Sequence, residues 1–568
     1  MSTKSGYLER PWLRSYPQGI APEVDIPVKS LCQAFDEATD KWKDKTAIIF
    51  YGTKIGYREM REKVDRFASA VSDIGIKKGD RVALLLLNCP QYFIAFYGLL
   101  KIGAIITPIS PAYVSPEIKY QLEDSGAENI VCLDFLYAGV EKTGVPLKRV
   151  ILTSIDEFLP ASSRLLGKSI LRGVFQKMAL PPSNIFKKGG FHQFKELLHK
   201  YPPAPPSISI DPKEDIVSLP YTGGTTGSPK GVMITHYGHM AVLSAYKAFY
   251  PFFEDGKEML IAYMPFYHIA GQWTAVVNPI LLGQTEIVLT SADLDDIINS
   301  IVNYQATFFG GAPAIFELLK DYDKTSKVEW KKLKMVSVGA DALHESTFKG
   351  WQRRTGINLH DAYGMTETSG LTHLTPKGGS KVGAVGIPVP NTLSAILDPE
   401  KDEFLPMREI GEIVVSGPQV CKGYWENPEA TRECEAIIEG VRWWRTGDLG
   451  FMTEDGYFHI YDRKRDLMKY KGLRVYAREV EEVLKTHPKI KEVGVVGAKD
   501  IKVGENVKAY VVLESDARGK LSEADIMEYC QDKLASYKIP RIIELVGEIP
   551  KTDVGKVSRR ELREMEED

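Results

Sequence analysis

The sequence predicts an α/β fold with a large N-terminal domain of layered sheets and helices and a small α+β C-terminal domain. The 568 residues are too many for one ordinary hydrophobic core. Short apolar runs alternate with longer helical patterns, as is typical of largely parallel sheets. A densely charged run at 462–466 then precedes a shorter tail of mixed character. We therefore expect the domains to span residues 1–462 and 463–568.

Apolar runs bounded by glycine, proline or aspartate are the predicted strands, and the longer segments between them are the predicted helices. Helices are expected at Tyr57–Ile74 and Asp293–Asn303. In the tail, the strand candidates are Val493–Val496 and Ala509–Leu513, and a helix is expected at Glu523–Leu534. The strands of the N-terminal domain are expected at Thr46–Phe50, Ala104–Pro108, Asn129–Leu133, Arg149–Leu152, Glu286–Leu289, Thr307–Phe309 and Met335–Val338.

The longest apolar stretch runs from Val82 to Leu100 and is interrupted by Asn88, Pro90 and Gln91. The interruption disfavours a membrane span. A buried strand followed by a helix beginning near Pro90 is the better interpretation, because proline suits the first helical position.

Composition excludes several classes of protein. The net charge of −3 gives no nucleic-acid signature. The six cysteines are scattered and form no CxxC pair, which argues against a zinc site and a disulfide framework and for a reducing compartment. The N-terminus has no apolar core of a signal peptide. We therefore expect a cytoplasmic protein.

One basic segment, residues 164–188, stands out. From Phe158 to Lys195 the chain carries seven basic residues and no acidic one, with apolar residues between the earlier basic ones. The segment suits an amphipathic helix on an anionic membrane surface, and it also suits a surface insertion with solvated lysines. The second interpretation is modestly favoured, and a peripheral membrane contact stays open, as does a homodimer.

A loop rich in hydrogen-bond donors, Tyr221–Gly231, carries the strongest chemical signal. It holds four glycines, three threonines and one lysine between two strand-like stretches. Glycines let backbone N–H groups turn toward an anion, and the hydroxyls and Lys230 add donors and positive charge. The loop is not a Walker A motif, because Gly231 follows Lys230 and leads into another strand-like run. It is predicted to hold the phosphates of ATP.

Five further segments combine chemistry-bearing residues with tight turns, and several follow predicted strands. Ligands of α/β sheets bind in loops beyond the carboxyl ends of strands, so these segments are expected to converge. No nucleophile-elbow motif is present. The segments are Pro265–Gly271, Gly310–Pro313, Val338–Asp341, Asp361–Thr368 and Trp444–Asp448.

Taken in order, these motifs resemble those of the adenylate-forming superfamily, which includes acyl-CoA synthetases, firefly luciferase and the adenylation domains of peptide synthetases. The resemblance covers nearly the whole chain, from the phosphate loop through the charged run at 462–466 to Lys556. Within the superfamily the chain is most similar to long-chain fatty-acid–CoA ligases, on the segments Arg10–Pro17, Asn88–Ile94 and Arg442–Asp448.

The resemblance implies a two-step reaction with ATP, Mg²⁺ and coenzyme A. The carboxylate of a fatty acid attacks the α-phosphorus of ATP, giving acyl-AMP and pyrophosphate. The CoA thiolate then attacks the acyl carbonyl, and AMP leaves. The chemical demand is neutralisation of the departing pyrophosphate by cations and N–H donors.

The resemblance also implies the site residues. His268, Glu367 and Lys556 are implied to be catalytic, and Glu367 and Thr222 are implied to bind Mg²⁺. The nucleotide, its phosphates and CoA are assigned to Thr222, Gly223, Gly224, Thr225, Thr226, Gly227, Lys230, Gly339, Ala340, Asp341, Tyr363, Gly364, Thr366, Asp448, Arg463, Lys469 and Gly472. The acyl pocket is assigned to Tyr267, Gly271, Trp273, Gly310, Gly311 and Met365, whose small members suggest room for a long chain.

The C-terminal domain of this superfamily is mobile and alternates between two arrangements. The resemblance places its pivot at Arg465. Trp273 is the candidate for the tryptophan that gates the tunnel in some long-chain members, although its register is one residue off.

Other interpretations stay open at this point. The acid could be medium-chain or aromatic, or the acceptor could be a carrier protein, although no Ser-centred carrier module follows Lys556. A non-catalytic nucleotide- or lipid-binding protein on the same fold is the alternative from another class, and light emission is a remote third.

Overall fold

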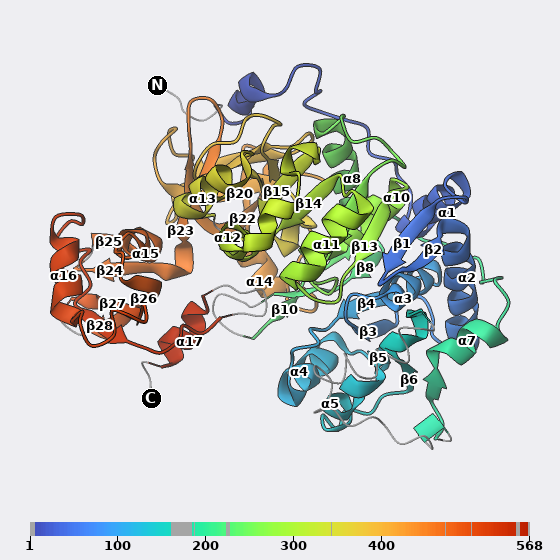
Figure 1. Cartoon of the computed structure of the whole chain (residues 1–568). Helices are drawn as coiled ribbons and strands as arrows, with labels where there is room; N and C mark the ends of the chain where they lie inside the picture. Colours follow the sequence, from blue (N-terminus) through green and yellow to red (C-terminus); the bar gives the residue numbers. More distant parts are fainter. Residues whose placement is uncertain are drawn as a thin grey trace.

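Three β-sheets of five or more strands organise the described part of the protein, and a fourth sheet has only two strands. The computed structural model describes residues 6–160, 185–186, 188–222, 228–341, 343–471, 473–500, 503–551 and 557–565. Two large sheets and their helices form the N-terminal part, and the third sheet forms a separate lobe beside it, drawn in red in Figure 1. This is the predicted combination of a large α/β domain and a smaller C-terminal domain.

The first large sheet has seven strands in the order β11-β8-β4-β3-β5-β6-β7. All neighbours are parallel except β11, which pairs antiparallel with β8. The strands are β3 (Arg81–Leu85), β4 (Ile105–Pro108), β5 (Asn129–Leu133), β6 (Arg149–Thr153), β7 (Phe191–Gln193), β8 (Ile216–Ser218) and β11 (Ile234–Thr235).

The apolar stretch after residue 81 forms β3 and then α3 (Pro90–Lys101), as expected. Every residue of α3 is buried, which explains its continuous apolar sequence without a membrane. None of the helices that the structure describes is long and apolar enough to cross a membrane.

The second large sheet has fourteen strands and is mixed. Its first half is parallel, from β1 (Thr46–Phe50) through β13 (Thr285–Val288), β12 (Met259–Ala262), β14 (Phe308–Gly311) and β15 (Met335–Gly339) to β16 (His360–Tyr363). At its edge, β2 (Thr53–Gly56) pairs antiparallel with β1.

Beyond β16 the sheet is antiparallel, which corrects the expectation of largely parallel sheets. The reason is the length of the connections. For example, β22 ends at Met452 and β23 begins at Phe458, which leaves no room for a crossover helix. These strands are β17 (His373–Leu374), β18 (Ala384–Pro388), β19 (Leu393–Leu397), β20 (Gly411–Ser416), β21 (Glu435–Ile438), β22 (Val441–Met452) and β23 (Phe458–Arg463).

Helices cover the sheets and close the cores. Trp351 of α13 packs edge-to-face on Trp330, with ring centres 4.7 Å apart, inside the core that α11, α12 and α13 share with the larger sheet. The helices of the N-terminal part are α1 (Leu31–Lys41), α2 (Tyr57–Asp73), α4 (Ser115–Ser125), α5 (Tyr137–Glu141), α7 (Phe194–Lys200), α8 (His236–Phe249), α9 (Ile269–Gly271), α10 (Asn278–Leu281), α11 (Leu294–Tyr304), α12 (Pro313–Asp321), α13 (Glu345–Thr355) and α14 (Pro428–Glu433).

The C-terminal lobe has its own hydrophobic core. Its sheet has the order β25-β24-β27-β26, and β28 also pairs with β27. We propose the domain boundary in the short segment after β23, where η9 (Lys464–Asp466) leads into the lobe. The elements are β24 (Leu467–Tyr470), β25 (Leu473–Tyr476), α15 (Ala477–Lys485), β26 (Ile490–Asp500), β27 (Gly504–Leu513), α16 (Glu523–Gln531), β28 (Ile542–Leu545) and α17 (Arg559–Glu564).

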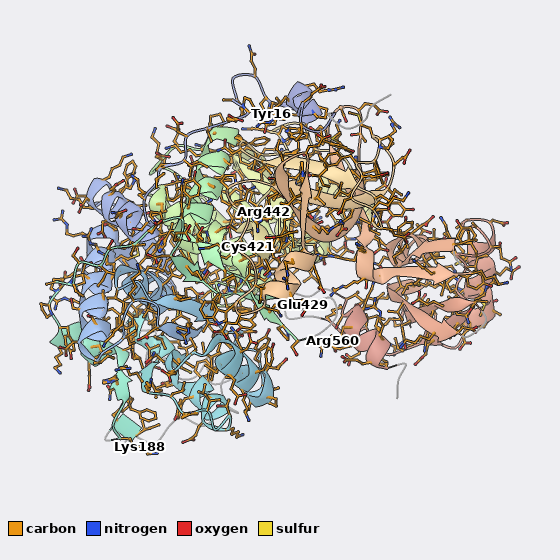
Figure 2. All side chains as sticks on the ribbon, turned by 180° about the vertical axis from the view of Figure 1, so that it is seen from behind. Tyr16, Lys188, Cys421, Glu429, Arg442 and Arg560 are labelled. Atoms are coloured by element: carbon orange, nitrogen blue, oxygen red, sulfur yellow. The ribbon has the colours of Figure 1, made fainter. Side chains whose placement is uncertain are left out.

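The basic segment 164–188 lies almost entirely outside the described residues. Its last residue, Lys188, is exposed and lies on the opposite side of the large domain from the C-terminal lobe (Figure 2).

Candidate nucleotide and acyl site

Two tyrosines hold the base of the phosphate loop. The strands β9 (Tyr221–Thr222) and β10 (Lys230–Gly231) pair so that Thr222 lies opposite Lys230. The Tyr221 hydroxyl donates to Asp124 of α4 at 2.6 Å, and Tyr120 of the same helix donates to the Pro229 carbonyl at 2.7 Å. Both ends of the loop are thus fixed to one helix. The predicted phosphate-binding residues Gly223, Gly224, Thr225, Thr226 and Gly227 lie outside the described residues.

Lys230 and Glu367 meet at one aromatic side chain. The Tyr424 hydroxyl donates to Glu367 Oε1 at 2.7 Å, and the Lys230 ammonium lies 5.2 Å from the centre of the Tyr424 ring. Glu367 lies in η8 (Thr366–Thr368), directly after the tight turn that follows β16, and its side chain is buried. The structure therefore brings a cation of the predicted phosphate loop to the ring of one tyrosine and a predicted metal-binding carboxylate to the hydroxyl of the same tyrosine.

A second cluster joins Tyr363, Asp448 and Arg463. The Tyr363 hydroxyl donates to Asp448 Oδ2 at 2.7 Å, and Arg463 Nε lies 2.6 Å from Asp448 Oδ1. Asp448 and Arg463 are direct partners in the pairing of β22 with β23. Asp448 is 2% exposed, whereas the Arg463 side chain is 41% exposed. The Asp448 carboxylate is thus buried in the sheet, and its cationic partner Arg463 is the more solvent-exposed of the two.

The charges of the two clusters act on each other. Burial raises the pKa of Glu367, and the hydrogen bond from Tyr424 and the charge of Arg463 oppose that shift. The pKa of Arg463 is raised first by Asp448 and also by Tyr363 and Glu367. Two buried carboxylates, Glu367 and Asp448, therefore interact with the more accessible Arg463, which suits the binding of a polar, anionic ligand together with a metal ion.

The loops at the ends of β15 and β16 are closely packed. A Cβ on Gly339 would lie 2.6 Å from the Ala362 carbonyl oxygen, and one on Gly364 would lie 2.4 Å from the Gly370 carbonyl oxygen. Ala340, next to Asp341, has a φ of 67°, which is uncommon for a residue with a side chain. Thr366 is buried beside Glu367. These predicted nucleotide-binding residues all lie at the carboxyl edge of the sheet.

His268, predicted to lie near the reacting carboxylate, is the N-cap of the helical segment that begins at Ile269. Its Nδ1 accepts a hydrogen bond from the Ala270 N–H at 3.2 Å, as an N-cap side chain does. Five residues later Trp273 lies in one turn of π-helix, η5 (Gln272–Val277). Its ring packs edge-to-face on Tyr246 at 5.9 Å. Tyr267 and Met365 are half-buried near these elements.

The glycines of the predicted acyl pocket are closely packed on the side where a side chain would begin. A Cβ on Gly271 would lie 2.1 Å from the Pro265 carbonyl oxygen, one on Gly311 would lie 1.8 Å from the Tyr263 hydroxyl, and one on Gly310 would lie 3.1 Å from the Phe308 ring. Neighbouring groups therefore already fill the room beside each glycine.

Two of the lobe residues predicted to act at the site lie within the described part of the chain. Lys469 pairs with Glu400, at 3.4 Å. Arg465 lies in η9, and its exposed side chain is next to the buried Asp466. Gly472 and Lys556 lie outside the described residues.

The lobe nevertheless faces the phosphate-loop side of the large domain. In Figure 1, α17 extends from the lobe toward α4 and β10. The pKa of Arg560 in α17 is raised mainly by Glu564, with a further contribution from Glu117 of α4. Figure 2 shows Arg560 and Glu429 of α14 where the lobe and the large domain face each other.

Sequence reasoning missed Tyr424 and the anchor of the lobe. Tyr424 belongs to a Gly-Tyr-Trp segment, which carries no chemical signal of its own. Within the charged run, Asp462 and Asp466 are buried, and Arg559 of α17 lies 3.6 Å from the first and 2.8 Å from the second. Burial opposes ionisation of Asp466, yet Arg559 and Arg563 keep its pKa below the usual value. The spacing of these charges gave no indication of a partner almost a hundred residues away.

Comparisons with known proteins agree with this geometry. The model of the AMP-binding enzyme family matches residues 35–425, and that of the AMP-binding enzyme C-terminal domain matches residues 479–556. A long-chain-fatty-acid–CoA ligase of Bacillus subtilis is 37% identical over 563 residues, covering 98% of each chain. A ligase of the same name from Escherichia coli O157:H7 is 32% identical over 573 residues, again covering 98% of each chain.

Among solved structures, ATP-bound MatB from Rhodopseudomonas palustris superimposes with a TM-score of 0.81 at 27% identity, covering 94% of this chain and 99% of the other. The family models together span most of the sequence, and the relatives match it from end to end. The chain belongs to the family of AMP-binding enzymes.

Proposed function

We propose that the protein activates a long-chain fatty acid with ATP and transfers the acyl group to coenzyme A. The observation that carries the proposal is the pair of clusters at the carboxyl edge of the larger sheet. One presents Lys230 and Glu367 around Tyr424, and the other presents Asp448 and Arg463 beside Tyr363. Together they match what a nucleoside triphosphate needs, and the activity is the one named for the full-length relatives.

In the first half-reaction, a fatty-acid oxygen forms a bond to the α-phosphorus as the bond to pyrophosphate breaks. Lys230, Thr222 and the loop residues 223–227 would hold the β- and γ-phosphates, because negative charge accumulates there as pyrophosphate leaves. Thr366 would contact the α-phosphate. Lys556 would stabilise the charge between the carboxylate and the α-phosphate.

The nucleoside would be held by the second cluster. Asp448 would accept hydrogen bonds from the ribose hydroxyls, with Arg463 assisting. The Tyr363 ring would stack on adenine beside the turn formed by Gly339, Ala340 and Asp341, and close to Gly364. Since Asp448 is locked between two donors, its oxygens are oriented before the nucleotide binds.

The residues present fit a magnesium ion. Mg²⁺ prefers carboxylate oxygens, and Glu367 is a buried carboxylate whose pKa is raised by burial. A divalent cation nearby would favour the ionised form, as Tyr424, a backbone hydrogen bond and Arg463 already do. Glu367 and Thr222 would hold the ion, which supplies charge neutralisation at the phosphates.

In the second half-reaction, the CoA thiolate sulfur bonds to the acyl carbonyl carbon and AMP departs with the carboxyl oxygen it received. We propose that the lobe turns about Arg465, withdrawing Lys556 and bringing Lys469 and Gly472 toward the CoA path. His268 would lie by the reacting carboxylate, while Tyr267, Gly271, Trp273, Gly310, Gly311 and Met365 would surround the first part of the acyl chain.

The protein would work in the cytoplasm, in keeping with six cysteines that are all free thiols. A contact of segment 164–188 with anionic membranes and a homodimer are further hypotheses. Sedimentation with anionic vesicles at low salt tests the first, and light scattering of the purified protein tests the second.

The first experiment is an assay with ATP, Mg²⁺, CoA and saturated acids from short to very long. Formation of AMP and acyl-CoA that peaks with long chains is expected. Acid-dependent exchange of pyrophosphate without a thioester would assign another acceptor. Absence of acid-dependent ATP consumption would overturn the catalytic proposal.

A further inference from the structure

A cavity lies inside the larger domain, and Trp273 is one of its lining residues. Its walls come from α8, η5 and strands β12 and β14, and most of them are apolar. Among the lining residues, Trp273 is the one nearest to His268 in the sequence. The lining residues are Tyr246, Phe253, Glu258, Leu260, Trp273, Thr274, Asn278, Pro279, Leu282, Gln284 and Phe308.

The far end of this cavity lies at the opposite edge of the sheet from the nucleotide. The predicted nucleotide-binding loops follow the carboxyl ends of parallel strands, whereas Glu258 and Gln284 come directly before β12 and β13. The two strands are four residues long, so these edges are about 13 Å apart at ~3.3 Å per residue. An acyl chain that enters beside Trp273 and extends along β12 would reach Glu258 and Gln284 with its tail.

This floor is polar, in contrast to the walls. Glu258 Oε1 is held by Lys334 at 2.6 Å and by the Glu254 N–H at 2.8 Å. The Gln284 side chain donates to the Glu254 carbonyl at 3.1 Å and accepts from the Glu258 N–H at 2.6 Å. Gln284 is therefore fully engaged and holds the floor in place.

Asn278 is different, because its amide has no partner in the part of the chain that the structure describes. The side chain is 3% exposed and lines the cavity, yet neither its oxygen nor its nitrogen makes a hydrogen bond. The outer oxygen of Glu258 is likewise buried and unpaired. Each buried polar group without a partner costs about 1–3 kcal/mol. An alkyl tail cannot form hydrogen bonds, so it would leave both amide atoms of Asn278 and the outer oxygen of Glu258 without partners.

On this basis, and resting on the proposed function, we infer that the acyl site takes a fatty acid that carries a hydroxyl group near its distal end, bound by Asn278. A hydroxyl has one donor hydrogen and can also accept, so it can donate to the Asn278 amide oxygen, or to Glu258, while it accepts from the Asn278 amide nitrogen. A keto oxygen can only accept, and a distal carboxylate would meet the negative charge of Glu258. The hydroxyl is therefore the group that can pair with both atoms of the Asn278 amide.

The test compares saturated acids with their ω-hydroxy counterparts over a series of chain lengths. At the length that reaches the floor, the hydroxy acid should have a kcat/KM for AMP formation at least about tenfold above that of the plain acid. In Asn278→Leu this preference should fall by about tenfold or more, because the paired amide is gone. Asn278→Ala serves if the leucine variant melts early.

Thr274→Val is the matched control. Thr274 lines the same cavity, but its hydroxyl already donates to the Ala270 carbonyl at 2.6 Å. Its replacement should leave the preference for the hydroxy acid unchanged. A preference that is equal in wild type and both Asn278 variants would overturn the inference, as would discrimination against the hydroxy acid at every length.

Direct binding separates this inference from the proposed function. Calorimetric titration of the wild type and Asn278→Leu with both kinds of acid, in the presence of ATP without CoA, needs no turnover. If no acid of either series yields AMP, the proposed activity fails. Tighter binding of the hydroxy acid by the wild type, but not by Asn278→Leu, would still support a hydroxyl site at Asn278. Equal binding of both acids by the wild type would refute that site.

Discussion

The Tyr424 hydroxyl donates a hydrogen bond of 2.7 Å to Glu367, and the Lys230 ammonium lies 5.2 Å from the centre of the same tyrosine ring. One aromatic side chain therefore connects the phosphate loop with the carboxylate proposed to hold Mg²⁺. We expect it to position both groups.

Replacing Tyr424 by phenylalanine should reduce acid-dependent pyrophosphate exchange by about tenfold, in line with the loss of a hydrogen bond to a charged group. The hydroxyl lowers the pKa of Glu367, so without it the pKa rises further and the carboxylate protonates at higher pH. The acid limb of the pH–rate profile should therefore move to higher pH.

Tyr322→Phe is the control for Tyr424→Phe, because Tyr322 donates in the same way to Asp295 on the surface, at 2.6 Å. It should leave rate and profile unchanged. An unshifted acid limb in Tyr424→Phe would contradict the positioning role, whatever the loss of rate.

The Asp448 carboxylate is expected to determine affinity for the nucleotide. Asp448→Asn keeps the shape but removes the charge between Tyr363 and Arg463. Charge-assisted hydrogen bonds are worth about 1.5–3 kcal/mol, so the KM for ATP should rise by about 10- to 100-fold. The KM for the fatty acid should change much less.

Asp402→Asn provides the comparison for Asp448→Asn. It removes an aspartate that pairs with Arg445 at an exposed position. Unchanged nucleotide affinity in Asp448→Asn, with a normal melting temperature, would remove Asp448 from the proposed ribose site.

The arrangement at Asp448 also shows what the sequence can and cannot predict. Local patterns located most strands of the parallel half of the sheet, since each parallel strand is a short buried run with clear boundaries. The sequence also identified the motif residues of the carboxyl-edge loops, because each motif is a short contiguous segment whose residue types indicate its chemistry. Their roles remain proposals.

What local patterns could not supply was pairing over long distances. Glu367 and Tyr424 are 57 residues apart, and Arg559 meets Asp466 across 93 residues. Neither pair has a periodic or compositional signal. The antiparallel half of the sheet was missed for a similar reason, because strand direction depends on which neighbours pair and not on the strand's own residues.

Glu286 should make stability depend on pH. It is fully buried in β13, both carboxylate oxygens lack partners among the described residues, and burial raises its pKa well above the usual value. The folded state then binds more protons than the unfolded state between the unfolded pKa of about 4.3 and the raised folded value. The free energy of unfolding should fall as pH rises through this interval.

Glu286→Gln removes that titration and should stabilise the protein by about 1–3 kcal/mol near neutral pH, with little gain below about pH 4. Urea unfolding of both proteins across this range measures the difference. Glu435→Gln, which changes a more accessible glutamate paired with Arg442, should show no such growing gain. A constant difference at all pH values would mean that Glu286 does not titrate as described.

The last prediction concerns the connection between the two domains. Arg465 lies in the middle of η9, between β23 of the large sheet and β24 of the lobe. Proline fixes φ near −65°, within the range of this 3-10 turn, and so opposes a rearrangement about residue 465. It also disfavours the helical conformation of Lys464, so some loss of thermal stability is expected.

Arg465→Pro should therefore retain most acid-dependent pyrophosphate exchange and lose most transfer of preformed acyl-AMP to CoA, because only the second step requires the lobe to turn. Arg465→Ala removes the same side chain and leaves the backbone free, so it should retain both activities. If both variants lose pyrophosphate exchange and acyl transfer equally, the arginine side chain is required and rotation about residue 465 is not. If Arg465→Pro transfers the acyl group at the wild-type rate, the lobe either does not turn or turns about another residue.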